Sequence, residues 1–334
     1  MLREPHPFAR FVNILGRGKS FSRALTVEEA QESMGMILDG QALPEQIGAY
    51  LMLLRFKEEA GSEIAGFAMA ARARFARPAG TPKVDLDWPS YAGKKRQLPW
   101  YILAALAIAG TGRRVLMHGA DGHTAGRIYS TQALAALGVP VARDAAEAAR
   151  HLNARNFAYL PLPAISPKLA EMLGLRPILG LRSPVHSLVR ALNPFDAGAS
   201  LLGVFHPGYM DIHRDAEVIL GHARTLIFRG DGGEAERRPN KPCELFTVHE
   251  AGYDERRWPA TIDPRQTPDE DMNLDRLAAV WRGEAGDAYG EAAAIGTIAL
   301  ALTAMGETRE PAEAQGAAAR LWAARDRART ILAA

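Results

Sequence analysis

The sequence predicts an α/β protein with a small N-terminal helical domain over residues 1–78 and a larger, mainly parallel α/β domain over residues 79–334. The first observation is apolar spacing of three and four among good helix formers in the N-terminal part, which is typical of amphipathic helices. The second is an alternation of strand-like and helix-like segments in the remainder, which is typical of a parallel sheet.

The N-terminal helices are expected over three segments, 25–40, 43–60 and 62–75. Thr26 precedes Glu28 and Glu29, so a capping side chain stands before acidic residues at the start of the first of these helices. Pro78, Pro82 and Pro89 then mark a linker into the larger domain.

In the larger domain, apolar runs bounded by glycine or proline predict strands over 84–86, 114–119, 200–207 and 225–230. Helices are expected over 101–110, 124–138 and the alanine-rich last fifty residues. The polar, turn-rich segment 231–243 is expected to be a loop.

Composition excludes several classes of protein. Charged residues make up 23% and apolar residues 48% of the 334 residues, which is typical of a globular protein and not of a disordered one. A net charge of +2 is too small to attract polyanions by itself, so any such affinity must come from local clustering. Cys243 is the only cysteine, and there is no apolar run of membrane-spanning length, so we expect a cytoplasmic protein without a membrane partner.

Two stretches combine basic residues with a lack of acidic ones. The first runs from Trp88 to Ala120 and the second from Met172 to Phe195. Their basic residues are Lys94, Lys95, Arg96, Arg113, Arg114 and His118 in the first, and Arg176, Arg182, His186 and Arg190 in the second. Such groups can neutralise phosphates, but a solvated loop or ordinary structural ion pairs would account for them as well.

Several blocks of sequence together resemble one family. They include Leu25–Ala30, Gln46–Met52, Glu63–Gly66, His118–Gly119, Leu179–Arg182, Asn193–Pro194 and Leu202–Val204. In order and spacing these blocks resemble the class III glycosyltransferases, which include anthranilate phosphoribosyltransferase and the pyrimidine nucleoside phosphorylases. The resemblance covers nearly the whole chain, and it implies an anthranilate phosphoribosyltransferase-like fold.

The chain departs from that family at the positions that hold a diphosphate and Mg²⁺. Residues 87–96 replace the Gly-Thr-Gly-Gly-Asp turn of the family and keep one glycine. The family's Lys-His-Gly-Asn-Arg block has here Met117 in place of lysine and Ala120 and Asp121 in place of Asn-Arg. Its Asp-Glu pair is Ala235 and Glu236 here, so that Asp231, Glu234 and Glu236 are only weak candidates for Mg²⁺. His118 and His123 have no third ligand at a spacing typical of zinc.

The chain also resembles the YbiB-type branch of these proteins, which implies a homodimer that binds nucleic acid without the biosynthetic activity. We therefore expect a nucleic-acid-binding protein without catalytic residues or a cofactor. The residues expected to contact phosphates are Lys94, Lys95, Arg96, Arg113, Arg114, His118, Arg176, Arg182 and Arg190. Trp88, Tyr91, Trp100 and Tyr101 are candidates for stacking on unpaired bases, which would favour single strands. The alternative for Trp100 and Tyr101 is that they begin a buried helix.

Two alternatives remain open. One is a phosphoribosyltransferase that uses Mg²⁺ and a phosphoribosyl diphosphate donor. The other is a protein-interaction scaffold with an inert cleft. The residues do not distinguish DNA from RNA.

Overall fold

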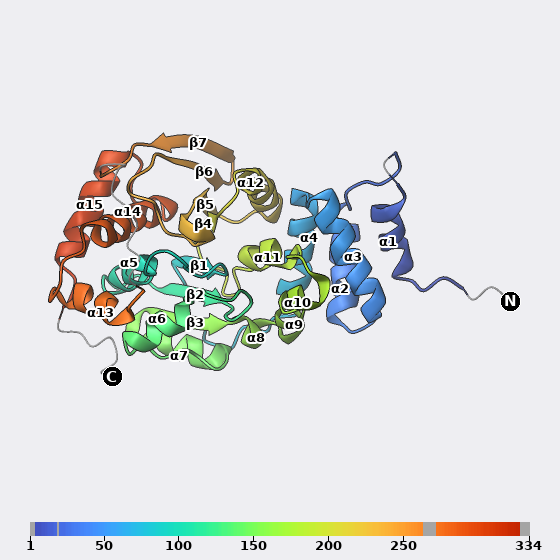
Figure 1. Cartoon of the computed structure of the whole chain (residues 1–334), viewed down its shortest axis with the longest axis horizontal. Helices are drawn as coiled ribbons and strands as arrows, with labels where there is room; N and C mark the ends of the chain where they lie inside the picture. Colours follow the sequence, from blue (N-terminus) through green and yellow to red (C-terminus); the bar gives the residue numbers. More distant parts are fainter. Residues whose placement is uncertain (1–3, 19, 263–271, 328–334) are drawn as a thin grey trace.

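The computed structural model describes residues 4–18, 20–262 and 272–327, and Figure 1 shows two parts, a helical domain and a larger domain built on one sheet. The predicted fold class is confirmed. Within the described residues, seven strands form that sheet in the order β3-β2-β1-β4-β5-β6-β7. The strands are β1 Leu86–Ser90, β2 Val115–Gly119, β3 Phe157–Pro161, β4 Ala199–Val204, β5 Arg224–Arg229, β6 Cys243–His249 and β7 Gly252–Trp258.

The first five strands are parallel, and β6 and β7 add an antiparallel edge. Every residue of β1, β2 and β4 is buried, as expected for central strands that are covered on both faces. The carboxyl ends of the parallel strands face the helical domain (Figure 1). The cleft at this edge therefore lies between the two domains.

The helical domain begins with α1 Ala9–Gly16, α2 Val27–Leu38, α3 Pro44–Lys57 and α4 Gly61–Arg72. The expected cap is present, because Thr26 Oγ1 accepts a hydrogen bond from Glu29 N at 3.2 Å and Glu29 Oε2 accepts one from Thr26 N at 2.9 Å. The chain returns to this domain in short helices, which extend its core: α8 Leu162–Ile165, α9 Pro167–Leu173, α10 Arg176–Leu179 and α11 Val185–Leu188. The 3₁₀ turn η1, Val189–Ala191, follows α11.

The remaining helices cover the sheet and its ends. They are α5 Trp100–Ala109, α6 Ser130–Ala136, α7 Ala145–Arg155, α12 Gly208–Leu220, α13 Leu274–Arg282, α14 Ala288–Ala304 and α15 Pro311–Ala323. All residues of α5 are buried, as its uniformly apolar sequence requires. No helix among the described residues is both apolar and long enough to cross a bilayer.

Three differences from the sequence-based expectations concern local structure. Strand β1 begins at Leu86 rather than at Val84, so that Trp88 lies inside it. The helix expected from residue 124 begins at Ser130, and the preceding residues form a loop. Strands β3, β6 and β7 were not predicted. For β7 the reason is that it is a mostly exposed edge strand with charged residues and has no apolar periodicity.

Candidate anion-binding cleft

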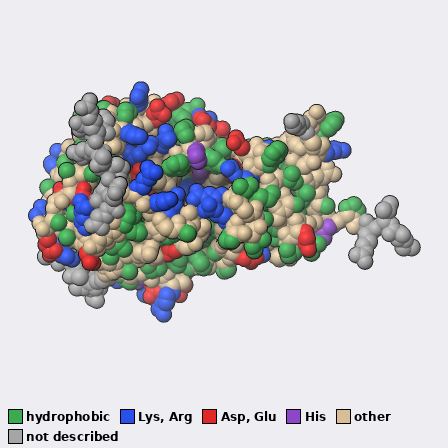
Figure 2. Space-filling view, in the orientation of Figure 1, with side chains coloured by type: hydrophobic (Ala, Val, Ile, Leu, Met, Phe, Trp, Pro, Cys, Tyr) green, Lys and Arg blue, Asp and Glu red, His purple; other side chains and the backbone are tan. Residues whose placement is uncertain are grey.

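Four arginines, Arg127, Arg176, Arg182 and Arg190, converge at the edge of the sheet that faces the helical domain, and we call them the arginine cluster. Arg176 Nη1 and Arg182 Nη2 both donate hydrogen bonds to Thr124 Oγ1, at 2.9 and 3.3 Å. None of the four forms an ion pair with a carboxylate of the described residues. Figure 2 shows Lys and Arg side chains gathered around a hollow in this region, with a histidine at its rim.

The mutual repulsion of these arginines is visible in the pKa of Arg182. Burial lowers this pKa, and the neighbouring charges of Arg127, Arg176 and Arg190 lower it further. Repulsion of this kind requires that the guanidinium groups lie close together and lack sufficient counter-charge. The cleft therefore attracts anions, and a bound anion would relieve the repulsion.

Two histidines in the cleft are neutral. The rings of His123 and His186 lie 5.2 Å apart in an edge-to-face arrangement. Burial, together with repulsion by Arg182 and Arg190, lowers the pKa of His123 to about 4. Burial, followed by the effects of His123, Arg182 and Arg190, lowers the pKa of His186 to about 3. Both rings therefore provide hydrogen-bonding atoms but no positive charge at neutral pH.

Lys94 is not available to a phosphate, and this corrects the expectation for that residue. Its side chain is 1% exposed and forms ion pairs with both Asp231 and Glu236. Burial alone would lower the pKa of Lys94, but the attraction of Glu236 and Asp231 outweighs burial and raises it. The ammonium group is therefore charged and already neutralised within the chain.

The turn that precedes Lys94 is also occupied by a group of the chain itself. Glu234 Oε1 accepts hydrogen bonds from the backbone N–H groups of Ala92, at 2.7 Å, and Gly93, at 2.5 Å. Gly93 has a φ of +69°, and a Cβ atom there would lie 3.0 Å from the Tyr129 ring, so glycine is required at this position. The adjacent amides that could hold an anion thus hold a carboxylate instead.

The amino end of α5 is likewise occupied by a carboxylate of the chain itself. Glu236 Oε2 accepts a hydrogen bond from Tyr101 N at 2.9 Å, while Oε1 of the same carboxylate pairs with Lys94. The amino end of a helix favours negative charge because its first N–H groups have no partner within the helix. Glu236 occupies this position from inside the protein, and burial raises the pKa of its carboxyl group to about 7.

The three weak metal candidates do not fit Mg²⁺ in this arrangement. Asp231 and Glu236 share the Lys94 ammonium, and Glu234 is bound to backbone amides. In the part of the chain that the structure describes, no three His, Cys, Asp or Glu residues are grouped so that they could hold a metal ion. A divalent cation would have to compete with an ammonium group that the chain itself supplies.

The other predicted phosphate contacts lie in different places. Lys95 and Arg96 are exposed on the loop after β1, beside the cleft. Arg113 and Arg114 precede β2 and therefore lie at the opposite edge of the sheet, where Arg113 forms a bidentate ion pair with Glu307 at 2.6 and 2.5 Å. The expectation that these two arginines share the cleft is wrong.

His118 is fully buried, so the expectation that it contacts phosphate is also wrong. Its Nδ1 atom lies 2.7 Å from the Tyr91 hydroxyl, and its Nε2 atom lies 3.3 Å from Asp87 Oδ1. The four aromatic residues considered for base stacking are buried as well, namely Trp88, Tyr91, Trp100 and Tyr101. The stacking expectation is therefore wrong, whereas the alternative for Trp100 and Tyr101, the start of a buried helix, is confirmed by α5.

The structure brings Arg176, Arg182 and Arg190 together, and it adds Arg127, which the sequence analysis missed. Arg127 Nη1 donates hydrogen bonds to the carbonyl groups of Ala92, at 2.8 Å, and Gly93, at 3.0 Å. Paired backbone hydrogen bonds of 2.8 Å between Lys94 and Ile128 hold the two loops together. One signal was available in the sequence, because residues 122–143 also lack any acidic residue.

Comparisons with known proteins agree with this architecture. Residues 10–75 match a family model described as the helical bundle domain of the glycosyl transferase family. The chain is 32% identical over 292 residues to anthranilate phosphoribosyltransferase of Anaeromyxobacter sp. (strain Fw109-5), covering 83% of this chain and 84% of that protein. It is 27% identical over 252 residues to the protein YbiB of Escherichia coli (strain K12), covering 73% and 77%.

Among solved structures, the yeast anthranilate phosphoribosyltransferase in complex with PRPP and Mg, from Saccharomyces cerevisiae, superposes with a TM-score of 0.78 at 15% identity. The superposition covers 97% of this chain and 95% of that one. This similarity concerns the fold alone. With the sequence relationship, it leads to one conclusion: the chain belongs to the anthranilate phosphoribosyltransferase family.

Proposed function

We propose that this protein binds nucleic acid, and that the arginine cluster contacts the phosphate backbone. The observation that carries the proposal is the convergence of four guanidinium groups that have no carboxylate partner among the described residues. Arginine binds phosphate well because its planar fork donates two parallel hydrogen bonds. Several such groups side by side suit a ligand that presents several phosphates.

The distribution of charge supports a local rather than a global attraction. The chain has 40 Lys and Arg residues against 38 Asp and Glu residues, so the protein as a whole is nearly neutral. A polyanion would therefore be attracted to the cleft and not to the rest of the surface. Binding through phosphates alone should show little preference for sequence.

The occupied turn argues against a role for this cleft in phosphoribosyl transfer. A diphosphate donor would need the amides that Glu234 holds, and a magnesium ion would need the carboxylates that Lys94 neutralises. All of these groups are paired, and all except Asp231, whose side chain is 23% exposed, are buried. Separating them would leave charges without partners in the interior, which is costly.

Phosphoribosyl transfer remains the second candidate because of one observation, the family to which the chain belongs. Under this alternative, Glu234 and Lys94 would have to leave their partners before a donor enters. Calorimetry with phosphoribosyl diphosphate and Mg²⁺ distinguishes the two candidates. Saturable binding of one donor per chain that requires Mg²⁺ would support the transferase, whereas its absence would support the nucleic-acid-binding function.

The test of the main proposal is the salt dependence of oligonucleotide binding, measured by fluorescence anisotropy. Four phosphate contacts on a single strand should weaken binding roughly 50-fold between about 50 and 200 mM salt, because each contact releases counterions. Oligonucleotides of unrelated sequence should bind with similar affinities. Absence of binding at low salt, or binding that salt does not change, would contradict the proposal.

We also propose that the protein is a homodimer joined through its helical domains, as the family resemblance implies. The helical domain presents large apolar side chains to solvent at Leu43 and Phe56, which are 50% and 87% exposed. Apolar groups of this size on one small domain favour contact with another protein surface. Light scattering coupled to size exclusion would test the oligomeric state, and a monomeric mass at micromolar concentration would contradict the proposal.

A further inference from the structure

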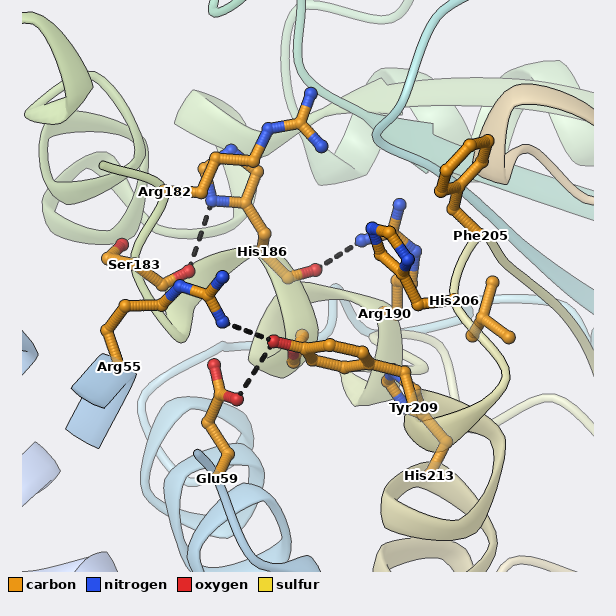
Figure 3. A pocket seen from close by; sticks show the side chains of 12 residues that line it. Arg55, Glu59, Arg182, Ser183, His186, Arg190, Phe205, His206, Tyr209 and His213 are labelled. Carbon is orange, nitrogen blue, oxygen red and sulfur yellow. Dashed lines mark hydrogen bonds between the residues drawn. The ribbon is translucent and has the colours of Figure 1, made fainter. Parts of the chain in front are cut away.

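A pocket opens between the helical domain and the carboxyl end of β4, next to the arginine cluster. Its cavity volume is about 130 Å³. Its wall on the helical side comes from Arg55 and Glu59, and the opposite wall comes from Phe205, His206 and Tyr209 (Figure 3). One water molecule needs only about 15 Å³ by the same measure, so the pocket can hold a larger group.

The interior of the pocket is lined by three arginines and by Glu59, together with two buried histidines that are neutral. His186 and His213 lie at its inner end, and they are 8% and 1% exposed. His186 Nε2 and His213 Nδ1 are buried and have no hydrogen-bond partner among the described residues. Because His186 Nδ1 lies 3.2 Å from the carbonyl oxygen of Ser183, its proton is on Nδ1 and its Nε2 atom is a free acceptor.

The wall on the helical side adds further acceptors and donors. Arg55 Nη1 donates a hydrogen bond to the Tyr209 hydroxyl at 2.9 Å, and that hydroxyl donates one to Glu59 Oε2 at 3.2 Å. The pocket therefore combines hydrogen-bond donors, on its arginines, with acceptors, on Glu59 and on His186 Nε2. They suit a neutral ring that has both donors and acceptors along its edge, as a nucleobase has.

The rim of the pocket carries an exposed aromatic ring. Phe205 is 51% exposed, although it directly follows the buried strand β4. His206, also exposed, lies with its ring 4.8 Å from that of Phe205 and nearly perpendicular to it. Exposed aromatic rings next to basic residues are typical of surfaces on which unpaired bases stack.

The pocket and the arginine cluster are continuous, since Arg182 and Arg190 belong to both. We infer that this pocket accepts one unpaired base of a strand whose phosphates lie on the arginine cluster, with Phe205 stacking on that base. The inference rests on the proposed function and narrows its ligand to single-stranded nucleic acid. A base within a duplex cannot reach the pocket unless it leaves the stack.

The experiment compares a single-stranded oligonucleotide with a duplex of the same sequence, using the full chain in low salt. The variants are Phe205→Ala and, as a matched control, Phe21→Ala, which removes another exposed phenylalanine that does not line the pocket. We expect the wild type to prefer the single strand. Phe205→Ala should weaken single-strand binding roughly ten-fold and leave duplex binding unchanged, as for loss of one stacked base. Phe21→Ala should change neither.

A second measurement uses 2-aminopurine in the single strand, whose fluorescence reports stacking. It should be quenched by the wild type and by Phe21→Ala, and less so by Phe205→Ala. Equal binding of strand and duplex, with no effect of Phe205→Ala on affinity or quenching, would overturn the base pocket and leave phosphate binding in place. Failure of both ligands to bind at low salt would overturn the proposed function, and the base pocket with it.

Discussion

Glu234 Oε1 lies 2.5 Å from the backbone nitrogen of Gly93 and accepts its hydrogen bond, although the two residues are 141 positions apart in the chain. This contact places a carboxylate on the turn for which the family resemblance implies a glycine-rich sequence. Lys94 in turn pairs with Asp231 and Glu236. The charged groups of this site therefore find their partners within the chain, and its stability should depend on these contacts.

Replacing Glu234 with alanine should expose the two turn amides. The loss of two charge-assisted hydrogen bonds should lower the free energy of unfolding by about 2 to 4 kcal/mol. Inorganic diphosphate should then raise the melting temperature of Glu234→Ala more than that of the wild type, because an added anion can take the place of the carboxylate. Thermal denaturation with and without diphosphate measures this difference. Equal stabilisation of both proteins would contradict the prediction.

The neighbouring lysines Lys94 and Lys95 should respond differently to the same substitution. Lys94→Met leaves Asp231 and Glu236 without a buried partner and should cost about 3 to 5 kcal/mol of unfolding free energy. Lys95→Met, at an exposed position, should change it by less than about 0.5 kcal/mol. Urea denaturation of both variants measures these values.

The effect of Mg²⁺ on stability provides a second measurement on the variants Lys94→Met and Lys95→Met. If the ammonium group takes the place of a cation, millimolar Mg²⁺ should stabilise Lys94→Met but neither Lys95→Met nor the wild type. If Mg²⁺ stabilised the wild type as much as Lys94→Met, this result would show that Lys94 does not exclude the metal.

Removal of Arg176 and Arg182 should weaken oligonucleotide binding and make it less sensitive to salt. The slope of log affinity against log salt should become shallower by about 0.7 for each phosphate that an arginine no longer neutralises on a single strand. The matched control is Arg113→Gln, since Arg113 lies at the other edge of the sheet in an ion pair with Glu307. Anisotropy titrations of Arg176→Gln, Arg182→Gln and Arg113→Gln at several salt concentrations provide the slopes. A slope that changes as much in Arg113→Gln as in the cluster variants would contradict the assignment.

The buried histidines should make the protein less stable in weak acid. The folded-state pKa of His186 is lowered to about 3, whereas an unfolded histidine titrates near 6.5. As the pH falls from 6.5 towards 3, the unfolded chain takes up a proton that the folded chain does not, so stability decreases. For His186 this loss should be about 2 kcal/mol at pH 5 relative to pH 8.

The measurement for this prediction is urea unfolding of the wild type and of His186→Gln at both pH values. The difference in stability between pH 8 and pH 5 should be smaller in His186→Gln by about 2 kcal/mol, because the substituted side chain does not titrate. An identical pH dependence in the two proteins would show that His186 does not contribute.

Local sequence determined the fold class and most of its elements. The helix cap at Thr26, the apolar period of the first domain and the apolar strand segments depend on residues near one another in the chain, and the structure confirms them. The sequence also indicated that the diphosphate and Mg²⁺ positions are altered. It could not indicate that Glu234 and Lys94 replace the missing interactions, since both make contacts across more than 130 residues.

The tertiary structure alone decided which charges face the cleft. Lys94 and Lys95 are adjacent in a basic run, yet one is buried between carboxylates and the other is exposed, because the loop folds back on the residues that follow β5. Arg113 and Arg176 both lie in stretches without acidic residues. Strand polarity nevertheless places Arg113 at the amino edge of the sheet, whereas the fold brings Arg176 to the carboxyl edge. The sequence thus determines which residues are charged, whereas the way in which distant strand ends meet determines the partners of these residues.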